Sequence, residues 1–209
     1  MLLRLYLLLP LALIANAPAV GQTSIRTETI RPPAPVQPAA GKFKSDGRVI
    51  VPAASSAAPE IIGDLARLPP AVAQTRDRML AAARSGNVHS LAAVALMNET
   101  VFSFSGEKDP VAYWRANYPD SEGVEVLAIL ITILETRFVH VDQGTPQEVY
   151  LWPYFARIPL KELSPERKVE LLRIVTGGDY NEMLGGGAYG FFRVGIAPDG
   201  SWQFFVTGD

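Results

Sequence analysis

The sequence predicts an α+β fold: N-terminal helices followed by a mostly antiparallel sheet with one helical insertion. Helical spacing of apolar residues dominates the first part of the folded region, and alternating apolar runs separated by turn residues dominate the last part. The chain has 209 residues, of which 48% are apolar. This length and composition are typical of a single packed domain with a tail.

Composition excludes several kinds of chemistry. The chain has no cysteine, which excludes disulfides, thiolate nucleophiles, Cys-ligated zinc and iron–sulfur clusters. Its formal net charge of -2 argues against a nucleic-acid partner, because proteins that bind the phosphate backbone are normally basic. The sequence contains no P-loop, G-x-S-x-G or H-E-x-x-H motif, and we expect no cofactor.

The first 19 residues are expected to be a signal peptide. Arg4 precedes an apolar run at residues 5–15, which is too short to span a bilayer, since a spanning helix needs about 20 residues. An A-x-A site at residues 17–19 allows cleavage before Val20, and a second one at residues 15–17 would leave a proline first. The mature protein is therefore predicted to be periplasmic or secreted. An uncleaved signal segment is its one expected link to a membrane.

Residues 20–59 are expected to form a flexible tether, because they are rich in Pro, Ala, Ser, Thr and Gln. A segment of this composition buries too little apolar area to offset its ordering entropy. An apolar island at residues 47–52 could pair as an edge strand. The folded domain is expected to cover residues 60–209.

Two helices are expected at the start of this domain. Pro70 suits the first turn of a helix that Gly86 ends, and Asn87 is the predicted N-cap of a second helix at residues 88–97. On the first helix we expect the polar residues to form a solvated face, with a basic binding patch as the alternative. These residues are Arg76, Asp77, Arg78 and Arg84.

A strand and two more helices follow. Residues 100–105 alternate and predict a strand with Val101 on one side and Phe102 and Phe104 on the other. An Asp-Pro pair then begins a helix that runs to about residue 117. The next helix, at residues 123–136, is apolar apart from a narrow polar stripe that includes Glu125 and Thr132. It is therefore predicted to be nearly buried.

The last part is expected to be β-rich. Strands are predicted at residues 138–142 and 148–152, and a hairpin at residues 189–196 and 201–207, with a Pro-Asp-Gly turn between its strands. On the last strand one face is expected to be formed by Trp202, Phe204 and Val206, with Phe205 on the other.

A helical insertion separates these two pairs of strands. Ser164 is the predicted N-cap, and the inner face is expected to hold Val169, Leu172, Ile174 and Val175. The glycines at 177–178 are expected to end the helix, and Asp179 could cap one further turn to residue 184. A further glycine run at 185–187 follows a helix and precedes a strand, which is the reverse of a phosphate-binding loop. We therefore interpret it as a loop that can move.

The chain has two histidines, and we expect His89 to lie on the surface. His140 and Asp142 are two residues apart on one strand, so their side chains share a face. Such a pair could bind a metal or act as a general base, but no third ligand is evident and no metal site is predicted. Packing of a half-buried histidine is the competing interpretation.

Acidic residues gather at the start of the predicted central helix. They are Asp120, Glu122 and Glu125. Carboxylates at this position interact favourably with the helix dipole, which is a sufficient structural reason for them. A glycoside hydrolase would instead need two carboxylates facing each other across a groove.

Aromatic residues provide the predicted binding site. Tyr150, Trp152 and Tyr154 are spaced by two, so on an unbroken strand they would share one face and could stack against a sugar or a peptide. Trp114 and Tyr189 could join them. The alternative is that these rings pack the core.

Residues 79–105, MLAAARSGNVHSLAAVALMNETVFSFS, resemble the opening of NTF2-like domains. The resemblance implies a cone-shaped α+β fold with a pocket lined by a curved sheet, but the helices expected at 123–136 and 164–176 depart from that pattern. The segments YLWPYFARIPLKELSPE and GFFRVGIAPDGSWQFFVTGD are similar to those of small secreted bacterial proteins of no assigned function. That resemblance implies export.

These observations favour an exported domain that binds a ligand or partner without catalysing a reaction. An envelope protein or a peptidoglycan fragment would be a suitable partner. One alternative is an envelope hydrolase that acts on glycan or peptide bonds through carboxylates of residues 120–125 with His140 or Asp142. The other is an NTF2-like small-molecule pocket.

Overall fold

A computed structural model describes residues 58–208. The expected signal peptide, the 47–52 island and nearly all of the expected tether lie outside the described residues.

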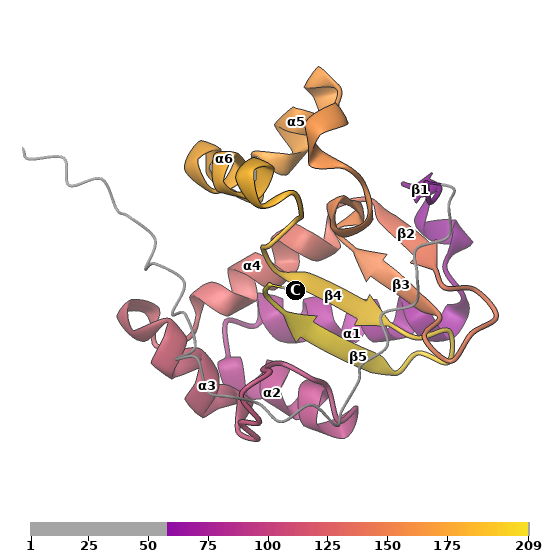
Figure 1. Ribbon diagram of the computed structural model, residues 1–209. Helices are drawn as coiled ribbons and strands as arrows, with labels where there is room; N and C mark the ends of the chain where they lie inside the picture. The colour runs from indigo at the N-terminus through magenta and orange to yellow at the C-terminus, as the bar shows by residue number, and fades with distance from the viewer. Residues whose placement is uncertain (1–57, 209) are drawn as a thin grey trace, which may run out of the picture. The chain divides into compact units, whose positions relative to one another are not determined.

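A five-stranded sheet forms the centre of the described domain (Figure 1). The strands neighbour one another in chain order, and each is antiparallel to the next. They are β1 (Ile61–Ile62), β2 (Phe138–Val141), β3 (Val149–Trp152), β4 (Arg193–Ile196) and β5 (Trp202–Val206). The predicted α+β class with an antiparallel sheet is confirmed, and β1 is an additional edge strand ahead of the helices.

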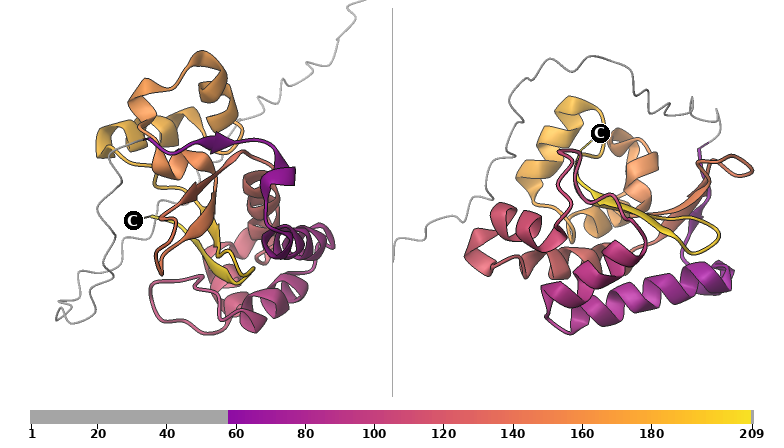
Figure 2. Two further views of the ribbon diagram at one scale, coloured as in Figure 1. Left: turned by 90° about the vertical axis from the view of Figure 1, so that its right-hand side faces the viewer. Right: turned by 90° about the horizontal axis from the view of Figure 1, so that it is seen from below.

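Helices lie on both faces of this sheet (Figures 1 and 2). Those before β2 are η1 (Leu65–Arg67), α1 (Pro70–Arg84), α2 (Val88–Met97), α3 (Pro110–Asn117), η2 (Pro119–Ser121) and α4 (Glu125–Leu134). Those between β3 and β4 are η3 (Tyr154–Arg157), η4 (Leu160–Glu162), α5 (Pro165–Leu171) and α6 (Gly177–Gly186). Between residues 58 and 208, no helix combines the length and the apolar character needed to cross a membrane.

Helices α2 and α3 begin directly after the capping residues that predict their starts. The Asn87 side chain accepts a hydrogen bond from the backbone N–H of His89, and the Asp109 side chain accepts from those of Val111 and Ala112. Pro70 occupies the first turn of α1. These contacts satisfy N–H groups that have no partner inside the helix, which explains why the predicted bounds of α2 and α3 are confirmed.

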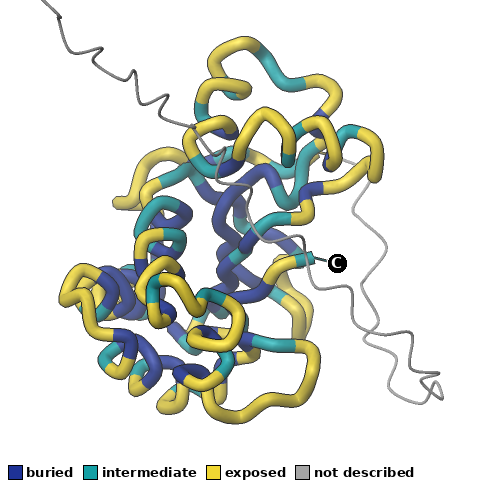
Figure 3. The backbone as a smooth tube through the Cα atoms, turned by 90° about the vertical axis from the view of Figure 1, so that its left-hand side faces the viewer, coloured by how far each residue is buried: buried dark blue, intermediate teal, exposed yellow. Residues whose placement is uncertain are grey.

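The sheet separates two apolar cores (Figure 3). The first lies against α1–α4 and contains Trp114, Trp152 and Trp202, none of which is more than 1% exposed. The second lies against η3, η4, α5 and α6. On β2, Phe138 enters the first core and Val139 the second, because successive strand residues point to opposite faces.

The strand predicted at residues 100–105 is wrong. Val101 makes one isolated parallel bridge to Phe204, and the chain then turns where the Ser103 hydroxyl accepts a hydrogen bond from the backbone N–H of Ser105. Such local serine contacts compete with strand pairing. Phe102 is buried, whereas Phe104 is 67% exposed, so the two rings do not share a face.

The prediction of which side chains share a face of the last strand is also wrong. A register shift at Gly195 and Ile196 interrupts the pairing of β4 with β5, and a bulge of this kind breaks the alternation of side chains. Trp202 and Phe205 therefore enter the first core together. Phe204 packs toward the second core, where its ring occupies the space that a Cβ on Gly195 would take.

The inserted segment forms two helices, and its predicted inner face is correct for Val175, which is buried, and for Ile174, which packs against both cores, but wrong for the other two residues. Val169 is 65% exposed and Leu172 is 44% exposed, while Leu171 is the buried residue of α5. The glycines at 177–178 begin α6 instead of ending α5, because Thr176 and Asp179 form a capping box ahead of it. The glycines at 185–187 end α6, with Gly187 in the left-handed conformation at its C-cap.

The turn between β4 and β5 depends on Gly200. Its φ is +88°, and a Cβ there would lie 2.8 Å from the backbone oxygen of Ala71 on α1. The carbonyl oxygen of Gly200 also accepts a hydrogen bond from the buried Thr75 hydroxyl at 2.6 Å. The absence of a side chain therefore lets α1 approach the hairpin closely.

We expect Gly200→Ala to lower the free energy of unfolding more than Gly144→Ala does. Gly144 also has a positive φ, +75°, but a Cβ there would meet nothing within 4 Å. The control substitution should cost about 1–2 kcal/mol for the left-handed backbone alone, and Gly200→Ala about 1–3 kcal/mol more for the overlap with Ala71. Urea unfolding monitored by circular dichroism measures both, and equal costs would contradict the close packing of α1 on this turn.

Candidate functional site

The five aromatic residues of the predicted binding site do not meet on one exposed face. Tyr150, Trp152 and Trp114 lie in the first core, and Tyr154 and Tyr189 in the second. Each is 6% exposed or less. Strand β3 ends at Trp152 and η3 begins at Tyr154, so the spacing of two that predicted a shared face does not continue past residue 152.

Each of these rings has a packing or hydrogen-bonding partner inside the protein. The Trp152 ring lies 5.0 Å from that of Phe138. The Tyr189 hydroxyl donates to the backbone oxygen of Phe192 at 3.0 Å, and burial raises the pKa of Tyr189. The structure thus places them as core residues, the alternative that the sequence left open.

His140 and Asp142 engage different partners. The His140 Nε2 lies 2.7 Å from a carboxylate oxygen of Glu148, and its ring stacks on Tyr150 with 4.1 Å between centroids. Asp142 has a positive φ of 55° and accepts a hydrogen bond from Arg157 at 2.6 Å. The backbone N–H of Gly144, and then His140, lower the pKa of Glu148.

The acidic residues 120–125 lie far from this histidine. They are exposed or partly exposed near α3 and the start of α4, and the β2–β3 loop lies at the opposite end of the described domain in Figures 1 and 2. The structure therefore does not bring Asp120, Glu122 and Glu125 into one cleft with His140 or Asp142. Across residues 58–208 no three His, Asp or Glu side chains form a group that could hold a metal ion.

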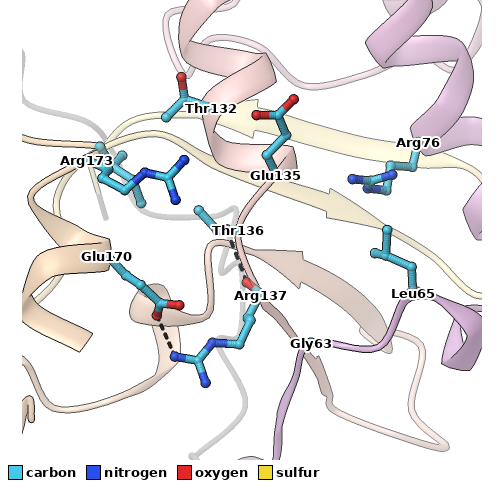
Figure 4. Close-up of a pocket in the computed structure, with 10 residues that line it drawn as sticks. Gly63, Leu65, Arg76, Thr132, Glu135, Thr136, Arg137, Glu170 and Arg173 are labelled. Carbon is cyan, nitrogen blue, oxygen red and sulfur yellow. Dashed lines mark hydrogen bonds and ion pairs between the residues drawn. The ribbon is translucent and has the colours of Figure 1, made fainter. Parts of the chain in front are cut away.

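A small cavity of about 140 Å³ opens where the two helical layers meet beside β1 and β2 (Figure 4). The residues around it come from η1, α1, α4, α5 and the segments that flank β1 and β2. They are Gly63, Leu65, Arg76, Thr132, Glu135, Thr136, Arg137, Glu170, Arg173 and Ile174. Three guanidinium groups and two carboxylates thus converge on one space, and we refer to it as the arginine cavity.

Arg76 is a buried charge with a defined position. It is 8% exposed, and its Nε and Nη2 donate to the backbone oxygen of Leu134, at 3.2 and 2.8 Å, at the end of α4. A cation is favourable there because the last carbonyls of a helix carry partial negative charge. Burial lowers the pKa of Arg76, but an arginine stays charged at neutral pH. The exposed Asp77 carboxylate lies 3.6 Å from its Nη1.

Arg137 is fixed by a network with Glu170 and Tyr154. Its Nη2 donates to the Glu170 carboxylate at 2.5 Å, and the Tyr154 hydroxyl donates to the same oxygen at 2.6 Å. The hydrogen bond to Glu170 raises the pKa of Arg137. Burial opposes ionisation of Glu170, but hydrogen bonds from Arg137 and Tyr154 outweigh it and lower its pKa. The Nε of Arg137 is buried and has no hydrogen-bond partner in the described part of the chain.

Arg173 is the third guanidinium, and it differs from the other two. It is exposed and lies in the turn after α5, where its backbone N–H donates to the oxygen of Glu170. Its guanidinium makes no hydrogen bond or ion pair with any residue from 58 to 208. Figure 4 shows its guanidinium and that of Arg76 directed toward the cavity from opposite sides. The cavity therefore offers one guanidinium, that of Arg173, that is not paired with a carboxylate of the described residues.

The arginine cavity can bind an anion but lacks a nucleophile with a base. Its two hydroxyls already donate to backbone carbonyls: Thr132 to Ala128 at 2.9 Å and Thr136 to Ile133 at 2.6 Å. No histidine lines it. Guanidinium groups present paired N–H donors that match a carboxylate or phosphate, which is the chemistry that the lining favours.

Sequence reasoning missed this cavity, and one prediction about it is wrong. The sequence predicts Arg76 on the solvated face of α1, but Arg76 is buried. Its spacing from Val72, Met79 and Ala83, which are also buried, places it on the apolar stripe. That spacing was available in the sequence. The convergence of Arg137 and Arg173 was not, because it depends on how α5 packs against the start of β2.

Comparisons of the chain with protein-family models, with curated proteins and with solved structures find no match.

We expect Trp152→Phe to lower the free energy of unfolding less than Trp202→Phe. Both rings are 0% exposed, but the Trp202 indole N–H donates to the backbone oxygen of Phe204 at 3.0 Å, whereas that of Trp152 is buried with no partner in the described residues. The difference should be about 1 kcal/mol, since one substitution loses a hydrogen bond and the other removes an unpaired donor. Urea unfolding measures it. A loss of stability in Trp152→Phe as large as that in Trp202→Phe would contradict the unpaired state of the Trp152 indole N–H.

Proposed function

We propose that the domain is a non-catalytic binding module that takes an anionic group in the arginine cavity. The observation that carries this proposal is Arg173, a guanidinium with no partner among the described residues, which faces Arg76 across the cavity. The arginine cavity thus combines a defined space with a guanidinium that is still available to a ligand.

The charges of the lining favour a small monoanion. Three guanidiniums face two carboxylates, which leaves one positive charge for a ligand to balance. A carboxylate can accept two parallel N–H bonds from a guanidinium, and such charge-assisted bonds are roughly twice as strong as neutral ones. For acetate, with four non-hydrogen atoms, a ceiling of about -1.5 kcal/mol per atom limits binding to about -6 kcal/mol. We therefore expect a carboxylate group alone to bind weakly but specifically.

We also propose that the protein acts outside the cytoplasm, on the strength of the signal-like residues 1–19. N-terminal sequencing of the exported product should find Val20 first. A product that retains Met1 and stays in the cytoplasm would contradict this part of the proposal.

The binding proposal is tested by nuclear magnetic resonance titration of ¹⁵N-labelled protein with sodium acetate at constant ionic strength. We expect saturable shifts of the amides of Gly63, Thr136 and Arg173, which lie around the cavity, and loss of saturation in Arg173→Gln, because this substitution removes the unpaired cation.

Arg115→Gln is the matched control. Arg115 is an exposed arginine on α3, away from the cavity, so the variant has the same net charge as Arg173→Gln. Equal weakening by the two substitutions would mean that acetate responds to overall charge, and the proposed site would be wrong.

A further inference from the structure

A second cavity of about 340 Å³ adjoins the arginine cavity. Five of its eight lining residues are apolar, and the remaining three are charged. They are Ala58, Pro59, Ile61, Ile158, Pro159, Arg137, Glu162 and Arg167. It is larger than the arginine cavity, in which Leu65 and Ile174 are the apolar side chains among ten lining residues. We refer to it as the apolar cavity.

Arg137 belongs to both cavities and separates them. It lines each one, and its stem passes close to Gly63, where a Cβ would lie 3.3 Å from the Arg137 Cδ. Its guanidinium is held on one side by Glu170. The two spaces are therefore neighbours on either side of one fixed side chain.

One extended segment runs past both cavities. Residues 58, 59 and 61 line the apolar cavity, and residues 63 and 65 line the arginine cavity. The strand within this segment, β1, is at the edge of the sheet and pairs with β2 alone among the described strands. Its other edge offers backbone N–H and C=O groups to an incoming chain.

We infer that the ligand is the C-terminus of a peptide that ends in apolar residues. This inference rests on the proposed function and names its ligand. The terminal carboxylate lies between Arg76 and Arg173, and an apolar side chain before it packs against Ile61 and Ile158 in the apolar cavity. Because the arginine cavity is at the residue 63–65 end of the segment, the peptide runs parallel to β1.

Two observations favour a peptide carboxylate over other anions. A phosphate dianion would exceed the single positive charge that the lining of the arginine cavity leaves uncompensated, whereas a carboxylate matches it. An aliphatic acid would fill the apolar cavity but would leave Glu162, Arg167 and the open edge of β1 without polar partners. Peptide amides supply such partners, as in known modes of strand addition and C-terminal carboxylate capture.

The test is a titration of the mature protein, from Val20, with four probes: acetyl-Ala-Val-Leu as the free acid, the same peptide as its C-terminal amide, hexanoate and acetate. We expect the peptide acid to bind at least about tenfold more tightly than acetate, and the amide and hexanoate at least about tenfold more weakly than the peptide acid. Because these arms use protein without any substitution, the result does not depend on whether a variant folds.

Two variants assign the parts of the ligand to the two cavities. Ile158→Ser should weaken the peptide acid about fivefold and leave acetate binding unchanged, while Arg173→Gln should weaken both probes. Acetate binding with no gain for the peptide acid, or hexanoate as tight as the peptide, would overturn this inference and leave the proposed function intact. Failure of acetate to bind at all would overturn the proposed function itself.

Discussion

The buried guanidinium of Arg76 on the oxygen of Leu134 is the contact on which the arrangement around the candidate site depends. It joins α1 to the last turn of α4, and β2 begins four residues after Leu134. The position at which α4 ends therefore sets where Arg137 leaves the backbone and where β2 enters the sheet. A charge this deeply buried must keep its partners, since removing one would leave it uncompensated at a cost of several kcal/mol. That requirement holds α1 and α4 together.

The same contact explains why the arginine cavity remains open to solvent without collapsing. Arg76 is held by a carbonyl, and Arg137 is held by Glu170 and Tyr154. Neither side chain is therefore free to leave its partner and fill the cavity. Glu135 is drawn outward by Arg84 at 2.9 Å. With its neighbours fixed in this way, Arg173 is left facing the cavity. The polar groups are preorganised, and a ligand that binds Arg173 would not have to displace an ion pair of that side chain within residues 58–208.

Much of the fold could be predicted from the sequence where the signals are local. Asn87, Asp109 and Ser164 mark helix starts because a capping side chain bonds to N–H groups two or three residues away. Predictions that required alternation to continue were wrong wherever the backbone changes direction: at Ser103, at the bulge of Gly195, and at the end of β3.

The candidate site illustrates a different limit. Arg76 could have been found from its place in the apolar stripe of α1. The other lining residues come from α4, α5 and the flanks of β1 and β2, and their convergence follows from the packing of both helical layers at one edge of the sheet. No spacing along the chain records that packing, so the sequence favoured the aromatic cluster, whose spacing of two is conspicuous but whose residues serve the two cores.

A ligand in the arginine cavity would affect the stability of the fold through helix α5. Leu171 is the buried residue of this helix, and Glu170 links it to the start of β2 through Arg137. The helix therefore has few contacts with the sheet compared with α1 and α4. A carboxylate held between Arg173, just beyond α5, and Arg76 on α1 would join the two layers across the edge of the sheet. Ligand binding of this kind adds to stability by mass action, and it would stabilise a helix that has one buried residue, Leu171.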